Sequence, residues 1–140
     1  LAKTSNPSSV ELQDMVAGDR VVYTVMGDLI ERWGKDTEGA CGYQALGAVV
    51  GATHPSVLKE LRRRLPKTFF LVPGYGAQGG TAEDVRNAFD ELGRGAIINA
   101  PRSIMCAWKK TDNNGLDYQE AARAAAEKMR DELKEYITVR

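Results

Sequence analysis

The sequence predicts an α/β fold made of parallel strand–helix units, and three observations support this prediction. Three short segments are almost wholly apolar and are bounded by glycine or proline, which is typical of strands buried on both faces. Each is followed by a segment with apolar residues at the helical period. The three strands begin at residues 45, 68 and 95, so the units recur at similar spacings.

Two architectures fit this order of elements. In a (β/α)8 TIM barrel one unit takes roughly 31 residues, so three units and the end of a strand at Leu1 amount to about four units, or half a barrel. A small open doubly wound sheet is the alternative, and periodicity does not separate the two. The first residues have the pattern of the end of a strand, and Leu1 is not an initiator Met. We therefore expect residues 1–140 to be a fragment that forms one partial domain.

The first half of the chain predicts a helix, a second helix, a strand and a third helix, at residues 6–15, 21–33, 45–51 and 53–65. Asn6-Pro7 opens the first helix, because Asn caps helices and Pro suits their first turn. The second helix carries one apolar stripe and ends at Gly34. The strand is a continuous apolar run, and the helix after it ends at Pro66.

The second half predicts a strand, a helix, a strand and a helix, at residues 68–72, 81–92, 95–99 and 117–137. Thr81 and Asp84 have the spacing of a capping box at the start of the first of these helices, and Gly93 ends it. The final helix carries an apolar stripe. A short turn and a polar loop connect it to the last strand.

Composition excludes several classes of protein. The 43% of hydrophobic residues is enough for a packed core, and 19 basic and 19 acidic side chains cancel, so the chain lacks the basic excess of a general nucleic-acid binder. Its apolar runs are shorter than the ~18 residues that span a bilayer. Two cysteines make no disulfide framework, and one histidine excludes a His-rich metal site. We expect a soluble, cytoplasmic protein that binds neither nucleic acid nor membrane.

The most informative segment is the glycine-rich loop at residues 73–80, between a strand and a helix start. It reads Pro73-Gly74-Tyr75-Gly76-Ala77-Gln78-Gly79-Gly80. Few Cβ atoms cover its backbone N–H groups, and a helix N-terminus follows, which together favour an anion site. Arg102, just past the next strand, would supply a fork of donors to the same anion. Barrels bind phosphate at the loops after strands seven and eight, which is where these segments would lie in a C-terminal half.

The same loop also matches G-x-G-x-x-G, the dinucleotide fingerprint, at Gly74, Gly76 and Gly79. That fingerprint needs an acidic residue about 20 positions further on, and the strand in question ends instead in Asn99-Ala100-Pro101-Arg102. The helix also begins after the motif rather than within it. We therefore favour a phosphate over a nicotinamide cofactor. A loop whose glycines merely turn the chain is a further alternative.

Four segments together resemble orotidine 5′-phosphate decarboxylase, and most of all its bacterial second subfamily. They are Thr4-Ser5-Asn6-Pro7, Val50-Gly51-Ala52-Thr53, the run from Phe70 through the glycine-rich loop, and Arg102-Ser103-Ile104. The resemblance runs in order from Leu1 to about Ala107, and the loop octet is highly specific. It implies an α/β fold that is the C-terminal half of a (β/α)8 TIM barrel.

The resemblance also implies an activity and a set of roles. Members of the family convert orotidine 5′-phosphate to uridine 5′-phosphate (UMP) in pyrimidine synthesis, as dimers, without cofactor or metal. By the family's pattern, Ser5 would hydrogen-bond the pyrimidine ring and Gln78 would bridge base and phosphate. The glycine-rich loop, including Gly79 and Gly80, would hold the phosphate through N–H groups, and Arg102 would pair with it.

Two departures from the family affect these expectations. Pro101 stands where many relatives have Gly or Ser, so one N–H donor is lost beside the phosphate. The family's proton donor belongs to an Asp-x-Lys-x-x-Asp motif from an earlier strand, and no such motif occurs in these 140 residues. We therefore expect no catalytic residue in this chain, which would pair with a missing N-terminal half-barrel. Another phosphate-binding TIM-barrel decarboxylase or isomerase, or a catalytically dead phosphate-binding fragment, is the alternative.

The remaining reactive side chains are expected to have ordinary roles. Cys41, Cys106 and His54 are interpreted as packing or surface residues rather than as a nucleophile and its base. The run Arg62-Arg63-Arg64 is interpreted as a solvated helix face rather than a phosphate or nucleic-acid patch, because the leucines on either side of it mark the core side of that helix.

Overall fold

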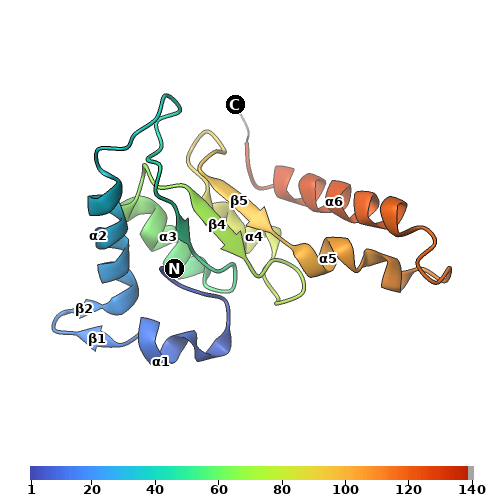
Figure 1. Ribbon diagram of the computed structural model, residues 1–140, viewed down its shortest axis with the longest axis horizontal. Helices are drawn as coiled ribbons and strands as arrows, with labels where there is room; N and C mark the ends of the chain where they lie inside the picture. The colour runs from blue at the N-terminus through green and yellow to red at the C-terminus, as the bar shows by residue number, and fades with distance from the viewer. Residues whose placement is uncertain (139–140) are drawn as a thin grey trace.

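The computed structural model describes residues 1–138 and shows an α/β fold with one parallel sheet (Figure 1). Its strands are β3 (Ala48–Val49), β4 (Phe70–Pro73) and β5 (Ala96–Asn99), hydrogen-bonded in that order. Lys3 forms a parallel bridge with Val50, so the start of the chain adds a strand position beside β3. The spatial order follows the chain order, as in the wall of a barrel, whereas a doubly wound sheet reverses its order at a switch point.

Helices flank the sheet, and in Figure 1 α2 and α6 lie at opposite ends of the molecule. The helices are α1 (Val10–Gln13), α2 (Val22–Gly34), α3 (Pro55–Arg64), α4 (Ala82–Val85), α5 (Pro101–Met105) and α6 (Tyr118–Lys134). Short 3-10 segments are η1 (Pro7–Ser9), η2 (Arg86–Ala88) and η3 (Ala107–Lys110). A hairpin of β1 (Val16–Ala17) and β2 (Arg20–Val21) precedes α2. Within residues 1–138, no helix has the length and apolar character to cross a membrane.

The hydrophobic core lies between one face of the sheet and α3. Phe70 and Val72 of β4 are fully buried, and so are Leu58 and Leu61 of α3. Leu71, between the two buried strand residues, is 39% exposed. Because side chains alternate between the faces of a strand, this pattern means that helices cover one face of the sheet and leave the other open.

The open face of the sheet carries large apolar side chains, with Phe69, Leu71 and Ile97 exposed by 41%, 39% and 57%. Exposed apolar surface and unpaired strand edges promote association between chains. We expect the isolated chain to self-associate, so that the midpoint of its thermal unfolding rises with chain concentration. Sedimentation and thermal unfolding over a wide concentration range test this. A monomer whose midpoint does not depend on concentration would contradict it.

Most predicted elements are confirmed with small shifts of their ends, namely helices 21–33, 53–65 and 117–137 and strands 68–72 and 95–99. The predicted strand 45–51 is shorter, since only β3 and the bridge at Val50 pair with neighbours. The predicted helix 6–15 is also shorter, with η1 followed by the single turn of α1. The chain then turns through the unpredicted hairpin at Gly18, whose φ of +71° suits glycine.

The predicted helix 81–92 ends early. Thr81 and Asp84 form the predicted capping box, but α4 gives way to η2 after one turn. Further on, the Asp90 carboxylate accepts hydrogen bonds from the N–H groups of Leu92 at 2.9 Å and Arg94 at 2.8 Å. This local turn competes with helical hydrogen bonds, so the helix stops before Asp90.

Asp90 also accepts a hydrogen bond from the Tyr43 hydroxyl at 2.7 Å. Burial raises the pKa of Asp90, but the hydrogen bonds from Tyr43 and from the N–H groups of Arg94 and Leu92 outweigh it and bring that pKa below its usual 3.8. A carboxyl group whose pKa is lowered by folding stabilises the protein above its unfolded pKa. That stability is lost as the pH falls through the folded pKa.

We therefore expect the Asp90→Asn variant to lose less unfolding free energy than the unmodified chain as the pH falls below 3.8, the ordinary pKa of an aspartate. Urea unfolding at one fixed chain concentration, repeated across the acid range, measures this loss. An acid dependence equal to that of the unmodified chain would show that Asp90 does not carry the effect.

Arg62 departs from its predicted place on a solvated helix face. Its guanidinium lies 3.8 Å from the centroid of the Phe70 ring, and burial lowers its pKa. It donates hydrogen bonds to the backbone carbonyls of Ala88, Leu65, Pro66, Thr68 and Gly95. The prediction is wrong for Arg62, because α3 ends beside the starts of β4 and β5. Arg63 is exposed as predicted, and Arg64 pairs with Asp28 at 2.7 Å.

Candidate functional site

The carboxyl ends of the parallel strands meet at one edge of the sheet and bring the predicted binding segments together. Ser5 follows the N-terminal strand segment, the glycine-rich loop follows β4, and Arg102 lies in α5 after β5. A cavity of about 220 Å³ is lined by Pro73, Gly74, Tyr75, Ala77, Gln78, Asn99, Ala100, Pro101 and Arg102. The glycine-rich loop and Arg102, which are distant in sequence, therefore share one cavity.

The glycine-rich loop is closed by hydrogen bonds within itself. The N–H of Gly76 donates to the Gly80 carbonyl at 2.8 Å, and the N–H of Gly80 donates to the Gly74 carbonyl at 3.1 Å. The N–H of Gly79 donates to Gly76 at 2.8 Å. Three of the expected anion donors are therefore already used. Among residues 1–138, the N–H groups of Tyr75, Ala77 and Gln78 have no such partner.

Two features explain why this loop needs glycine. Gly74, Gly76 and Gly79 have φ values of +99°, +68° and +97°, which side chains disfavour. Gly80 allows close approach, since a Cβ there would lie 2.6 Å from the Ala52 Cβ. The loop is thereby seated on the segment that follows β3. The helix after the loop is a single turn, so the helix N-terminus that the sequence suggested as part of the anion site is short.

Ser5 and Gln78 contact each other across the site. The Ser5 hydroxyl donates a hydrogen bond to the Gln78 Oε1 at 2.9 Å. This leaves the Gln78 amide nitrogen and the lone pairs of the Ser5 hydroxyl oxygen for other partners. The structure thus places side by side the side chain that the resemblance assigns to the pyrimidine ring, Ser5, and the one that it assigns to both base and phosphate, Gln78.

Arg102 is exposed and lines the cavity from α5. Among residues 1–138, its guanidinium forms no hydrogen bond or ion pair with another side chain. Pro101 is the first residue of α5 and has no N–H to donate. Arg102 is therefore the cation that the cavity offers to an anion.

Tyr75 anchors the glycine-rich loop to the last helix. Its side chain is buried, and its hydroxyl donates to the Glu132 carboxylate of α6 at 2.6 Å. Burial and the neighbouring Glu132 carboxylate raise the pKa of Tyr75. Because its side chain is used in this way, the part of Tyr75 available to a ligand is its N–H group.

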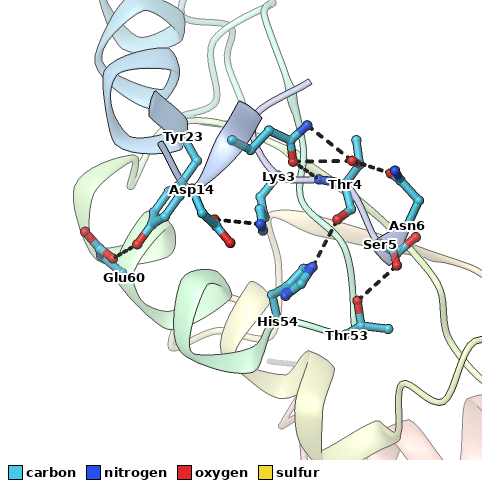
Figure 2. A network of polar contacts seen from close by, with 10 residues as sticks. Lys3, Thr4, Ser5, Asn6, Asp14, Tyr23, Thr53, His54 and Glu60 are labelled. Carbon is cyan, nitrogen blue, oxygen red and sulfur yellow. Dashed lines mark hydrogen bonds and ion pairs between the residues drawn. The ribbon is translucent and has the colours of Figure 1, made fainter. Parts of the chain in front are cut away.

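An ion pair and a hydrogen bond that no sequence pattern predicted lie near the segment before Ser5 (Figure 2). The buried Lys3 places its Nζ 2.6 Å from the Asp14 Oδ1. Nearby, the Tyr23 hydroxyl donates to Glu60 at 2.9 Å, and burial together with this carboxylate raises the pKa of Tyr23 to about 12. Their partners are far apart in sequence, so no local pattern signals these pairs.

Comparison with curated proteins finds relatives over nearly the whole chain, although no protein-family model matches it. The chain is 43% identical over 138 residues to an orotidine 5′-phosphate decarboxylase of Rhodopirellula baltica, covering 96% of this chain and 46% of that protein. It is 38% identical to that of Caldicellulosiruptor bescii, covering 99% of this chain and 45% of the relative. The chain thus spans about half the length of the curated relatives it matches.

Solved structures agree with this result. The OMP decarboxylase of Leishmania donovani matches with a TM-score of 0.67 and 30% identity, covering 95% of this chain and 46% of that one. The UMP synthase of the same organism matches with a TM-score of 0.59 and 34% identity, covering 89% and 26%. The predicted fold class, half of a (β/α)8 TIM barrel, is confirmed, and so is the predicted resemblance.

Proposed function

We propose that this chain is the substrate-binding C-terminal half of an orotidine 5′-phosphate decarboxylase. The proposal follows from the likeness of the chain to about half of that enzyme's barrel. In this proposal residues 1–140 form one partial domain. The complete barrel, meaning this chain with an N-terminal half-barrel, converts orotidine 5′-phosphate to UMP and carbon dioxide. The observation that carries the proposal is the cavity that the glycine-rich loop shares with Arg102, because it places a guanidinium beside backbone N–H groups that have no partner among residues 1–138.

The phosphate of the substrate is bound in this cavity. The Arg102 guanidinium supplies charge-assisted hydrogen bonds, which are short and strong. The N–H groups of Tyr75, Ala77 and Gln78 supply the backbone donors, because those of Gly76, Gly79 and Gly80 are used inside the loop. Gly79 and Gly80 then serve the phosphate by shaping the loop around it.

The pyrimidine ring is recognised by the Ser5–Gln78 pair. A pyrimidine of this class presents an N–H donor between two carbonyl acceptors. The Ser5 hydroxyl oxygen can accept from that N–H while its own proton stays on Gln78, 2.9 Å away. The Gln78 amide nitrogen can donate toward the base or the phosphate, since Gln78 also lines the phosphate cavity.

The chemical step takes place beyond this chain. In the proposal, the lysine and aspartates of an Asp-x-Lys-x-x-Asp motif belong to the N-terminal half-barrel, and no residue of this chain is catalytic. The contacts with the phosphate contribute to the reaction from a distance, because binding energy from a non-reacting part of a substrate can hold the reacting group in place. The resemblance further implies a homodimer that uses no metal or cofactor, and the composition predicts a cytoplasmic protein.

Ligand binding to the complete barrel, measured by calorimetry, tests the proposal. We expect UMP to bind at least about 100-fold more tightly than uridine, because uridine lacks the phosphate contacts, worth about 3 kcal/mol or more. We also expect ribose 5-phosphate, which lacks the base, to bind more weakly than UMP. Equal affinity for UMP and ribose 5-phosphate would favour another phosphate-binding barrel enzyme instead.

A further inference from the structure

The backbone of Thr4, just before Ser5, is held by side chains from two different helices. The Thr4 N–H donates to the Gln13 Oε1 at 2.8 Å, at the end of α1. On its other side, the Thr4 carbonyl lies 3.0 Å from the His54 Nε2, at the start of α3 (Figure 2). Both polar groups of the Thr4 backbone are therefore fixed by side chains rather than by a neighbouring strand.

The chemistry of these contacts defines their direction. A carbonyl only accepts hydrogen bonds, so His54 donates and carries a proton on Nε2. Gln13 accepts from the Thr4 N–H, and its Nε2 lies 3.2 Å from the Thr4 hydroxyl. Thr53 adds a longer contact of 3.5 Å from its hydroxyl to the Ser5 carbonyl. Each contact uses a complementary donor and acceptor.

The contacts of Gln13 and His54 with the Thr4 backbone lie beyond the last residue of the N-terminal segment that pairs with a strand. The last strand pairing of the N-terminal segment is the bridge between Lys3 and Val50, and Ser5 lies two residues beyond Lys3. The Ser5 hydroxyl nevertheless lies 2.9 Å from Gln78. Fixing both polar groups of the Thr4 peptide backbone limits the directions in which the next side chain can point.

We propose that His54 and Gln13 are positioning residues that aim the Ser5 hydroxyl at the pyrimidine ring of the substrate. This inference rests on the proposed function. Neither residue touches the phosphate cavity between the glycine-rich loop and Arg102. Their loss should therefore weaken recognition of the base and leave recognition of the phosphate unchanged.

The test compares UMP with ribose 5-phosphate on the complete barrel. Loss of one hydrogen bond of this kind corresponds to about a fivefold to tenfold weaker binding. We expect His54→Ala and Gln13→Ala each to weaken UMP by this factor and to leave ribose 5-phosphate unchanged. His54→Gln, which keeps an N–H donor, should restore much of the affinity for UMP. Lys59→Ala, an exposed position of the same helix, is the matched control and should change neither ligand.

A double mutant separates positioning from general stabilisation. If His54 acts through Ser5, then His54→Ala should have no further effect on UMP affinity once Ser5→Ala is present. Equal losses for UMP and ribose 5-phosphate, or additive effects of the two substitutions, would overturn the inference while leaving the proposed function intact. Failure of the unmodified barrel to prefer UMP over ribose 5-phosphate would overturn both.

Discussion

Replacing Arg102 by alanine should lower the kcat/KM of the complete barrel for orotidine 5′-phosphate by about two to three powers of ten. Charge-assisted hydrogen bonds to phosphate contribute roughly 1.5–3 kcal/mol each, and the guanidinium fork makes more than one. With Pro101 unable to donate, the loss is about 3–4 kcal/mol. Steady-state kinetics of the variant measure the effect.

A substrate without the phosphate provides the control for this prediction. On the phosphate-free nucleoside the Arg102→Ala penalty should be much smaller, because that compound never makes the contact. Arg86→Ala, at an exposed position of η2, should leave both reactions unchanged. Equal Arg102→Ala penalties on both compounds would mean that Arg102 is a structural residue and that the anion is bound elsewhere.

Replacing Arg62 by alanine should lower the free energy of unfolding by about 3–5 kcal/mol. The substitution removes the donors to the carbonyls of Ala88, Leu65, Pro66, Thr68 and Gly95 together. It also removes the cation that lies 3.8 Å from the centre of the Phe70 ring. Through these carbonyls the hydrogen bonds of Arg62 connect the end of α3 to the starts of β4 and β5. Removing the side chain should therefore destabilise the sheet as well as the helix.

The measurement is urea unfolding at one chain concentration, which keeps association constant between variants. Arg62→Lys should remain strongly destabilised, because a lysine offers three donors on a flexible stem in place of a planar fork. The neighbouring Arg63→Ala should change stability by less than about 0.5 kcal/mol, since Arg63 is exposed. A destabilisation by Arg62→Ala no larger than that of Arg63→Ala would contradict this role.

The parts of the fold that local patterns specify could be predicted from the sequence. The apolar stripe and terminal Gly34 delimit α2, and the spacing of Thr81 and Asp84 gives the capping box that the structure contains. The common location of the glycine-rich loop and Arg102 was also predictable. It follows from the rule that parallel strands present their carboxyl ends at one edge of the sheet.

What the sequence did not reveal depends on contacts between distant segments. Arg62 follows the polar pattern of its helix, and only the positions of the carbonyls of Ala88 and Gly95 show that this half-buried side chain connects separate segments. The internal hydrogen bonds of Gly76 and Gly80 depend on how the loop folds back on itself. From the sequence, His54 is only a residue at the start of a helix. Its contact with the Thr4 carbonyl depends on the fold, which places the two residues side by side.

Under the proposed function, this chain is the substrate-binding half of an orotidine 5′-phosphate decarboxylase. Chromatography of the products formed when the complete barrel is incubated with orotidine 5′-phosphate tests this most directly. We predict that UMP appears in the same molar amount as the substrate that disappears, and that Arg102→Ala slows its appearance. A folded complete barrel that leaves orotidine 5′-phosphate unchanged would contradict the claim.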